Sequence, residues 1–431
     1  MQDYELTTLA DGERVITERL DRVRSVAIGF WVGSGSRDED EGRAGVSHFL
    51  EHLLFKGTRS YSAQEIAETF DGLGGELNAV TTREYTVVYA RVMDEHLETA
   101  LDVMSDMVYA PTLADLDSER EVVLEEIAMV EDAPQDLVHD LLGQAVFGDH
   151  PLGRPVLGRA EVIESVTRRV LLAQHRSRYV APSTVVAAAG NIDHDQLVGL
   201  IRGHAAKKAP QPSRSPRPRA LLVEPPSAGT VFQRKDTEQY HVCIGAPGLA
   251  RDDDRRFALS ILDSILGGSA SSRLFQEIRE KRGLAYNVYT FASLFAETGE
   301  LGIYVGTRED NLERCLEITA QEIDDLAAGG AKEAELRRAK ESMKGRIMLS
   351  MESTSSRVNR LGKSIVTDSE LLDLDEILGH IEAVEADDVG GLAAELLAPE
   401  RLSAAGIGPT EALFQKAVEH VNPGLLEAAA A

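Results

Sequence analysis

Cysteine, tryptophan and long apolar runs are scarce in this chain. Its 431 residues include two cysteines and one tryptophan, and aromatic residues make up 5% of the sequence. Two cysteines, Cys243 and Cys315, provide neither a disulfide framework nor a cysteine metal site, so we expect reduced thiols and a cytoplasmic location. No apolar run approaches the roughly 18 residues that a membrane-spanning helix needs, and we expect no signal peptide at the acidic N-terminus.

Basic residues are also in deficit. The 72 Asp and Glu residues exceed the 45 Lys and Arg residues, which leaves a net charge of −27. Such a surface repels nucleic acid and anionic membranes, so we expect neither as a partner. It favours cationic partners, although an acidic surface also serves solubility alone.

The most informative segment is His48-Phe49-Leu50-Glu51-His52. Residues four apart share one face of a helix, so the two imidazoles can reach a single metal ion. The order H-x-x-E-H inverts the H-E-x-x-H signature of zinc proteases, in which two histidines hold Zn²⁺ and a glutamate that is not a ligand acts as the general base. The motif alone does not distinguish a metal site from two structural histidines, so the next question is whether a third ligand exists.

A helical pattern over residues 117–132 offers carboxylates for that role. Glu119 and Glu126 are seven residues apart and therefore share a helix face. Such a pair suits one metal ligand and one carboxylate that orients a ligand histidine through a hydrogen bond. An acidic, solvated helix face is the alternative interpretation.

Prolines alternate with basic residues over 207–219, a composition typical of an extended spacer. We therefore predict an N-terminal domain over 1–206, a linker over 207–219 and a C-terminal domain over 220–431. At an offset of 214 residues, the segment 37–40 (RDED) aligns with 251–254 (RDDD), and His48, Glu51 and His52 align with Leu262, Ile265 and Leu266. The second half is thus predicted to be a degenerate copy in which the metal positions have become core.

Strand-like and helical patterns alternate in both halves. The expected strands span residues 4–9, 14–18, 25–32, 76–81, 85–92 and 184–189, then 230–234, 239–246, 288–295 and 301–307. Ser62 and Glu65 form a capping box that predicts the start of a helix. Further expected helices span 95–109, 117–132, 134–147 and 253–266, with helices continuing to about residue 399. Helices that flank largely antiparallel strands indicate an α+β fold of two homologous domains.

The segments 30–39 (FWVGSGSRDE) and 45–58 (GVSHFLEHLLFKGT) closely resemble the pitrilysin-type zinc metallopeptidases, or inverzincins, of family M16. The resemblance is strongest to bacterial relatives of the mitochondrial processing peptidase β subunit. In that family a glutamate some seventy residues after the second histidine, within E-R-x-x-V-x-x-E, completes the zinc site. Glu126 follows His52 by 74 residues and ends such a segment, so the resemblance implies that Glu126 is the third ligand and Glu119 the orienting carboxylate, with one Zn²⁺ per chain.

The resemblance also implies how a substrate binds. Residues 74–81 (GGELNAVT) resemble the family's edge strand beside the zinc, to which a peptide adds as a further strand, with Asn78, Ala79 and Thr81 in contact with it. Arg279 and Tyr286 are seven residues apart and match a family pair that contacts the substrate. The family further implies a clam-shell of two domains around a chamber, and a homodimer.

The sequence therefore predicts a zinc endopeptidase that cleaves short or unfolded peptides, including peptides that carry Lys or Arg. Glu51 would deprotonate the attacking water. One alternative is a catalytically silent or structural partner subunit of a processing-peptidase-like heterodimer. Another is a metallohydrolase with a non-peptide substrate, which the edge-strand motif disfavours because strand addition needs a peptide backbone.

Overall fold

A computed structural model of the chain describes residues 4–204, 221–222 and 224–425. Its residues form two compact units, each built from segments of both halves of the sequence. Of the described residues, unit 1 comprises 4–128, 155–204 and 347–373, and unit 2 comprises 129–154, 221–222, 224–346 and 374–425. The units thus differ from the predicted linear division in two segments, 129–154 and 347–373, which lie with the other half's unit. The predicted linker, 207–219, lies outside the described residues.

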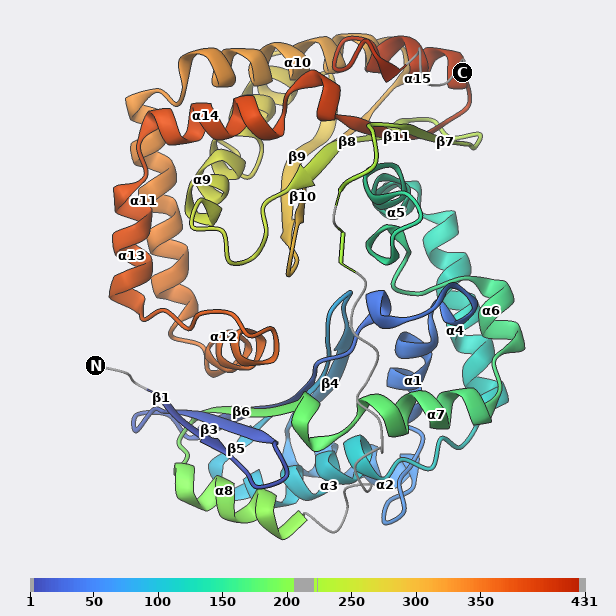
Figure 1. Cartoon of the computed structure of the whole chain (residues 1–431), viewed down its shortest axis with the longest axis vertical. Coiled ribbons are helices and arrows are strands. Elements are labelled where there is room, and N and C mark those ends of the chain that lie inside the picture. The colour runs from blue at the N-terminus through green and yellow to red at the C-terminus, as the bar shows by residue number, and fades with distance from the viewer. Residues whose placement is uncertain (1–3, 205–220, 223, 426–431) are drawn as a thin grey trace. The chain divides into compact units, whose positions relative to one another are not determined.

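The sheet of unit 1 has the strand order β1-β2-β6-β3-β5-β4. Figure 1 labels five of these strands, β1, β3, β4, β5 and β6. Its strands are β1 (Tyr4–Thr8), β2 (Arg14–Arg19), β3 (Ser25–Val32), β4 (Glu76–Thr81), β5 (Thr86–Met93) and β6 (Thr184–Gly190). Every neighbouring pair is antiparallel except β2 and β6. The order ends at β4, so β4 is an edge strand of this sheet.

Alternate residues of β3 supply two cores on opposite faces of that sheet. Phe30 and its neighbours at even positions pack with α1 (Val46–Leu54) and α3 (Leu97–Tyr109). Trp31 packs with Val358 and Leu361 of α12 (Thr354–Val366), a helix from the second half of the sequence. A Cβ on Gly362 would lie 2.3 Å from the Trp31 ring, so glycine allows α12 to approach the sheet closely. Both faces of the sheet are therefore covered.

The sheet of unit 2 has the order β7-β11-β8-β10-β9. Its strands are β7 (Thr230–Arg234), β8 (Tyr240–Gly248), β9 (Ala285–Leu294), β10 (Gly299–Thr307) and β11 (Ser403–Gly408). Of the neighbouring strand pairs in this sheet, β7 and β11 are parallel and the other three are antiparallel. Helix α5 (Pro134–Phe147), from the first half of the sequence, packs on one face through Val138 and Leu142. Element by element, this order repeats β2-β6-β3-β5-β4 of unit 1, so the two units share one topology.

The remaining helices flank these sheets. Those of the first half are α2 (Ala63–Leu73), α4 (Leu116–Asp132), α6 (Ala160–Ser165), α7 (Arg168–Arg178) and α8 (His194–Gly203). Those of the second half are α9 (Arg256–Leu266), α10 (Leu312–Gly329), α11 (Glu333–Ser350), α13 (Leu374–Ala383), α14 (Ala386–Leu396) and α15 (Glu411–Val418). Across the described ranges, none of the helices combines the length and apolarity that crossing a bilayer requires.

The predicted α+β class, with two homologous, mostly antiparallel sheets flanked by helices, is confirmed. The predicted limits of β3, β4, β7 and α5 coincide with those observed, and Ser62 and Glu65 form the predicted capping box of α2. Sequence patterns did not predict β11, a central strand of small residues. The clam-shell arrangement stays a prediction.

Candidate metal and catalytic site

Helix α1 carries the H-x-x-E-H segment and is anchored by its apolar face. Phe49, Leu50 and Leu53 are fully buried, whereas the His48 and His52 side chains retain 12% and 16% of their accessible surface. The helix begins at Gly45, whose φ of 98° is left-handed and where an added Cβ would lie 2.4 Å from the Leu157 carbonyl oxygen. The N-cap position therefore requires glycine, and this glycine fixes where the helix that carries the two histidines begins.

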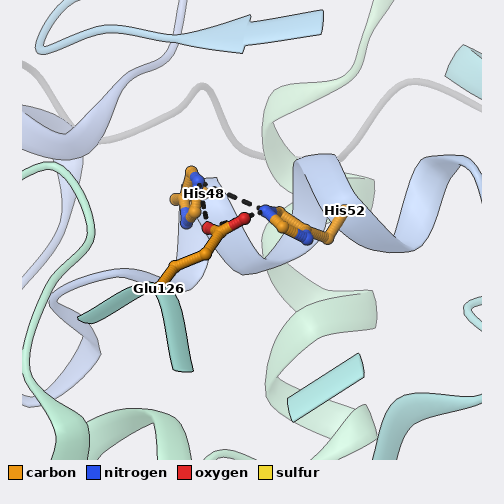
Figure 2. Close-up of side chains that lie close together, drawn as sticks. All are labelled: His48, His52 and Glu126. Carbon is orange, nitrogen blue, oxygen red and sulfur yellow. Dashed lines mark hydrogen bonds and ion pairs between the residues drawn. The ribbon is translucent and has the colours of Figure 1, made fainter. Parts of the chain in front are cut away.

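Glu126 reaches the two histidines from α4 (Figure 2). The Nε2 atoms of His48 and His52 are 3.3 Å apart. The Glu126 Oε2 atom lies 3.6 Å from Nε2 of His48 and 3.3 Å from Nε2 of His52. Among the described residues, no other trio of potential His, Cys, Asp or Glu ligands gathers its ligand atoms within 4.8 Å.

These distances fit a tetrahedral zinc ion. Ligand atoms about 2.0–2.2 Å from Zn²⁺ at tetrahedral angles lie roughly 3.3–3.6 Å from one another. The two nitrogens and one carboxylate oxygen also match the donor set of a catalytic zinc site, which leaves a fourth position open. Glu125, the neighbouring carboxylate on this helix, is exposed and takes no part in this group.

The protonation state of His48 suits a metal ligand. Burial, together with the nearby His52 ring, lowers the pKa of His48 to about 4. The imidazole is therefore neutral at neutral pH, the form in which it can donate a lone pair to a metal.

Glu119 holds the far side of His52. Its Oε1 atom lies 3.0 Å from Nδ1 of His52, and its Oε2 atom accepts from Nζ of Lys56 at 2.7 Å. A proton on Nδ1 directed at Glu119 leaves the Nε2 lone pair pointing toward the metal group. The structure therefore places Glu119 where the sequence predicted an orienting carboxylate.

Glu51 is partly buried beside the ligands, and its carboxylate contacts β4. Its Oε2 atom accepts a hydrogen bond from the Thr81 hydroxyl at 2.5 Å. Burial raises the pKa of Glu51, against the lowering effect of the Thr81 hydroxyl and of His52. A carboxylate with a raised pKa is a stronger base, which is the property that proton abstraction from water needs.

The three predicted substrate contacts on β4 take different positions. Asn78 is exposed on the edge strand and accepts the Ala79 amide proton at 2.8 Å through Oδ1. Ala79 is buried, and Thr81 faces Glu51 rather than solvent. The side chain of Asn78 is thus the one of the three that lies open to solvent.

Arg279 and Tyr286 form a defined local structure in unit 2. The Arg279 guanidinium lies between two aromatic rings, 4.7 Å from the centroid of Phe275 and 4.6 Å from that of Tyr286. Phe275 and Arg279 belong to a π-helix (Phe275–Glu280), and Tyr286 is 70% exposed. Both predicted residues line a cavity of about 370 Å³. Their contact with a substrate stays a prediction.

Two supporting contacts escaped sequence reasoning. Lys56 lies within the motif segment, four residues after His52, and this spacing was a usable signal that it shares the histidine's side of the chain. The contact between Thr81 and Glu51 had no such signal, because 30 residues separate them. Thr81 was predicted only as a substrate contact.

Comparison with known proteins places these residues in a family. Residues 14–160 match the family model of insulinase, peptidase family M16, and residues 165–343 match the peptidase M16 inactive domain. A protein of Streptomyces coelicolor named "uncharacterized zinc protease" is 44% identical over 409 residues, which is 94% of this chain and 89% of that protein. This chain belongs to peptidase family M16. The predicted family resemblance is therefore confirmed.

Two further proteins are similar to this chain, one in sequence and one in fold. A Bacillus subtilis protein, also named as a zinc protease, is 42% identical over 90% of this chain and 94% of its own length. A protease from Helicobacter pylori has the same fold, with a TM-score of 0.87 at 22% identity over 94% of this chain and 99% of the other. The segment matched to the first M16 domain contains all the residues of the metal group, Glu51 and Glu119.

Proposed function

We propose that this protein is a zinc-dependent endopeptidase that cleaves short or unfolded peptides. The observation that carries the proposal is the convergence of His48, His52 and Glu126 at ligand distances, with the partly buried Glu51 beside them. The zinc protease names of relatives that match nearly the whole chain support the choice of metal.

His48, His52 and Glu126 would hold one zinc ion per chain. When bound, zinc polarises the scissile carbonyl and makes water acidic enough to be deprotonated near neutral pH. Glu51 takes the proton from the attacking water and then delivers it to the leaving amine. The Thr81 hydroxyl holds the Glu51 carboxylate in place for both transfers. Glu119 fixes the ring of His52 and is in turn held by Lys56.

The edge strand β4 supports the proposed preference for extended peptide chains. The sheet order ends at β4, and Thr81 on this strand touches Glu51. A peptide that pairs with β4 would therefore have its backbone beside the catalytic carboxylate. Main-chain pairing needs an extended segment, which short and unfolded peptides supply and folded proteins do not.

The decisive experiment compares the wild type with Glu51→Gln, each brought to one zinc per chain. We expect the wild type to cleave an unfolded Arg-containing peptide, and the variant to be slower by a factor of about 10²–10⁴, the usual contribution of a general base. Glu125→Gln, which changes an exposed carboxylate of the same helix as Glu126, should cleave normally.

Two results would contradict the proposal. Full activity of Glu51→Gln would remove Glu51 from the chemistry. Failure of the zinc-loaded wild type to cut any member of a broad peptide library would favour the partner-subunit alternative.

We also expect a homodimer in the cytoplasm, which sedimentation and cell fractionation would test.

A further inference from the structure

Helix α1 lacks a side chain of its own to cap its N-terminus. Its N-cap residue is Gly45, and its first turn contains no acidic residue. Glu39, six residues upstream, fills this place. Its Oε2 atom accepts the Gly45 amide proton at 2.8 Å, and its Oε1 atom accepts the Ser47 amide proton at 2.5 Å. One carboxylate therefore satisfies two of the backbone donors that a helix leaves free at its start.

The position of this cap relative to the ligands is what gives it significance. Ser47, whose amide Glu39 accepts, immediately precedes His48. The Glu39 side chain is 6% exposed, so neither hydrogen bond is exchanged readily for one to water. A negative charge at this end also complements the helix dipole. The backbone from which His48 projects is thereby held from outside the helix.

The loop that carries Glu39 is itself fixed to the turn between β4 and β5. The Ser36 amide donates to the Thr82 carbonyl and the Arg37 amide to the Arg83 carbonyl, each at 3.0 Å. The buried Arg37 guanidinium pairs with Glu84 at 2.7 Å. This turn begins directly after Thr81, the partner of Glu51. The loop thus joins the start of the ligand helix to the strand that holds the catalytic carboxylate.

We propose that Glu39 is a positioning residue of the metal group: its carboxylate fixes the first turn of α1 so that His48 meets His52 and Glu126 at ligand distance. This inference deepens the proposed function and rests on it. Glu39 touches neither metal nor substrate, and acts through the backbone of Gly45 and Ser47.

The electrostatics of Glu39 fit positioning better than simple stabilisation. Burial raises the pKa of Glu39 to about 7, although the hydrogen bonds from Ser47 and Gly45 lower it. Because the folded state binds this proton more tightly than the unfolded state, the contribution of Glu39 to stability falls as the pH rises from about 4.5 toward 7. Ionisation of Glu39 therefore lowers the stability of the fold relative to the protonated form over this pH range.

The test measures metal binding without any peptide. Zinc affinity is determined by chelator competition for the wild type, Glu39→Gln and a matched variant, Glu13→Gln. Glu13 is also a fully buried carboxyl of unit 1, but it accepts from the Tyr109 hydroxyl. We expect Glu39→Gln to bind zinc about 10–100-fold more weakly, as loss of a supporting contact usually does. Glu13→Gln should bind as the wild type does.

Two further readouts separate positioning from general damage. The visible absorption spectrum of the Co²⁺-loaded protein reports ligand geometry, and it should change in Glu39→Gln only. In peptide cleavage, kcat should fall while KM stays within about twofold, since ground-state substrate binding is untouched. Glu39→Asp keeps the charge, but its shorter side chain cannot reach both amides, so its zinc affinity should be intermediate. This variant replaces Glu39→Gln in the test if Glu39→Gln does not fold.

Wild-type zinc affinity and an unchanged Co²⁺ spectrum in the Glu39 variants would overturn the inference. Equal losses in Glu39→Gln and Glu13→Gln would overturn it as well. These outcomes are distinct from failure of the proposed function, in which the wild type binds zinc and cleaves no peptide.

Discussion

Helices α1 and α9 follow corresponding strands in two sheets of one topology, yet among the described residues only α1 contributes to a group of potential metal ligands. At the offset of 214 residues, His48, Glu51 and His52 correspond to Leu262, Ile265 and Leu266, which are 0%, 4% and 0% exposed. This burial agrees with the predicted degenerate copy. The same helix position can thus serve either as core or as a ligand platform.

The difference depends on the element that faces the helix as much as on the helix itself. In unit 1, α4 directs Glu119 and Glu126 at the histidines. In unit 2, α11 occupies the corresponding place in the element order, and it buries Ala339 and Met343 instead. In unit 1 the potential ligands therefore come from two helices, whereas the corresponding positions of α9 are apolar and buried.

The largest effect is expected when His48 of α1 is replaced by leucine, the residue at the corresponding position of α9. We expect His48→Leu to weaken zinc binding by more than about 100-fold, since loss of a mere supporting contact costs 10–100-fold, and to abolish cleavage. Thermal unfolding of the metal-free variant should be no easier than that of the metal-free wild type. His420→Leu, at an exposed histidine of unit 2, is the control and should retain zinc. Full zinc binding by His48→Leu would refute the ligand assignment.

The reverse substitution places a histidine at Leu262 of α9, the position that corresponds to His48 of α1. Leu262→His should lower the free energy of unfolding by about 2–5 kcal/mol, because it removes packed apolar volume and buries a polar ring without a designed partner. Urea denaturation measures this loss. The variant should gain no zinc site, since α11 offers no matching carboxylate at Ala339 or Met343. An unchanged midpoint of unfolding would show that α9 is not a core counterpart of α1.

Loss of the orienting carboxylate should have a smaller effect than loss of a ligand. Glu119→Gln keeps the size of the side chain but weakens its hold on His52 and Lys56. We expect zinc affinity to fall by about 10–100-fold, with a parallel loss of activity at limiting zinc. Lys56→Met removes the ammonium group that contacts the other oxygen of Glu119, and it should lower zinc affinity by less than Glu119→Gln does. Zinc affinity equal to that of the wild type in both variants would assign this network to stability alone.

The pH profile of cleavage should report the environment of Glu51. Because its pKa is raised by burial and the base must be ionised, kcat/KM should increase with pH over a range above that of an ordinary glutamate. Thr81→Val removes a hydrogen bond that stabilises the ionised form, so this rise should shift to higher pH. Steady-state kinetics from pH 4 to 8 would check both. An unshifted profile in Thr81→Val would mean that the rise reports another group.

The smallest predicted effect concerns the overall charge of −27. At low ionic strength we expect peptides rich in Lys or Arg to be cleaved a few times faster than acidic peptides of the same length, with the preference fading as salt screens the surface. Competition between matched peptides at two salt concentrations would measure it. Equal cleavage of both peptides at low salt would exclude electrostatic selection.

Local sequence patterns specified many of the helices and strands and the residue types of the potential ligands. Four-residue spacing placed His48 and His52 on one helix face, and seven-residue spacing did the same for Glu119 and Glu126. The limits of β4 and α5 and the capping box of α2 were also readable. Such features depend on periodicity and on neighbours within a few residues, which the chain encodes directly. The resemblance to the family then implied which of these carboxylates is the ligand, Glu126.

Only the tertiary structure shows which segments that are far apart in the sequence lie in contact. Strand β11 has no β-branched run, and its place between β7 and β8 follows from pairing across the chain. Helix α12 packs on the sheet of unit 1 and α5 on that of unit 2, although each belongs by sequence to the other half. The hydrogen bond from Thr81 to Glu51 and the cap that Glu39 gives to α1 arise in the same way. Contacts of this kind depend on close packing among residues far apart in the chain, and no local pattern specifies them.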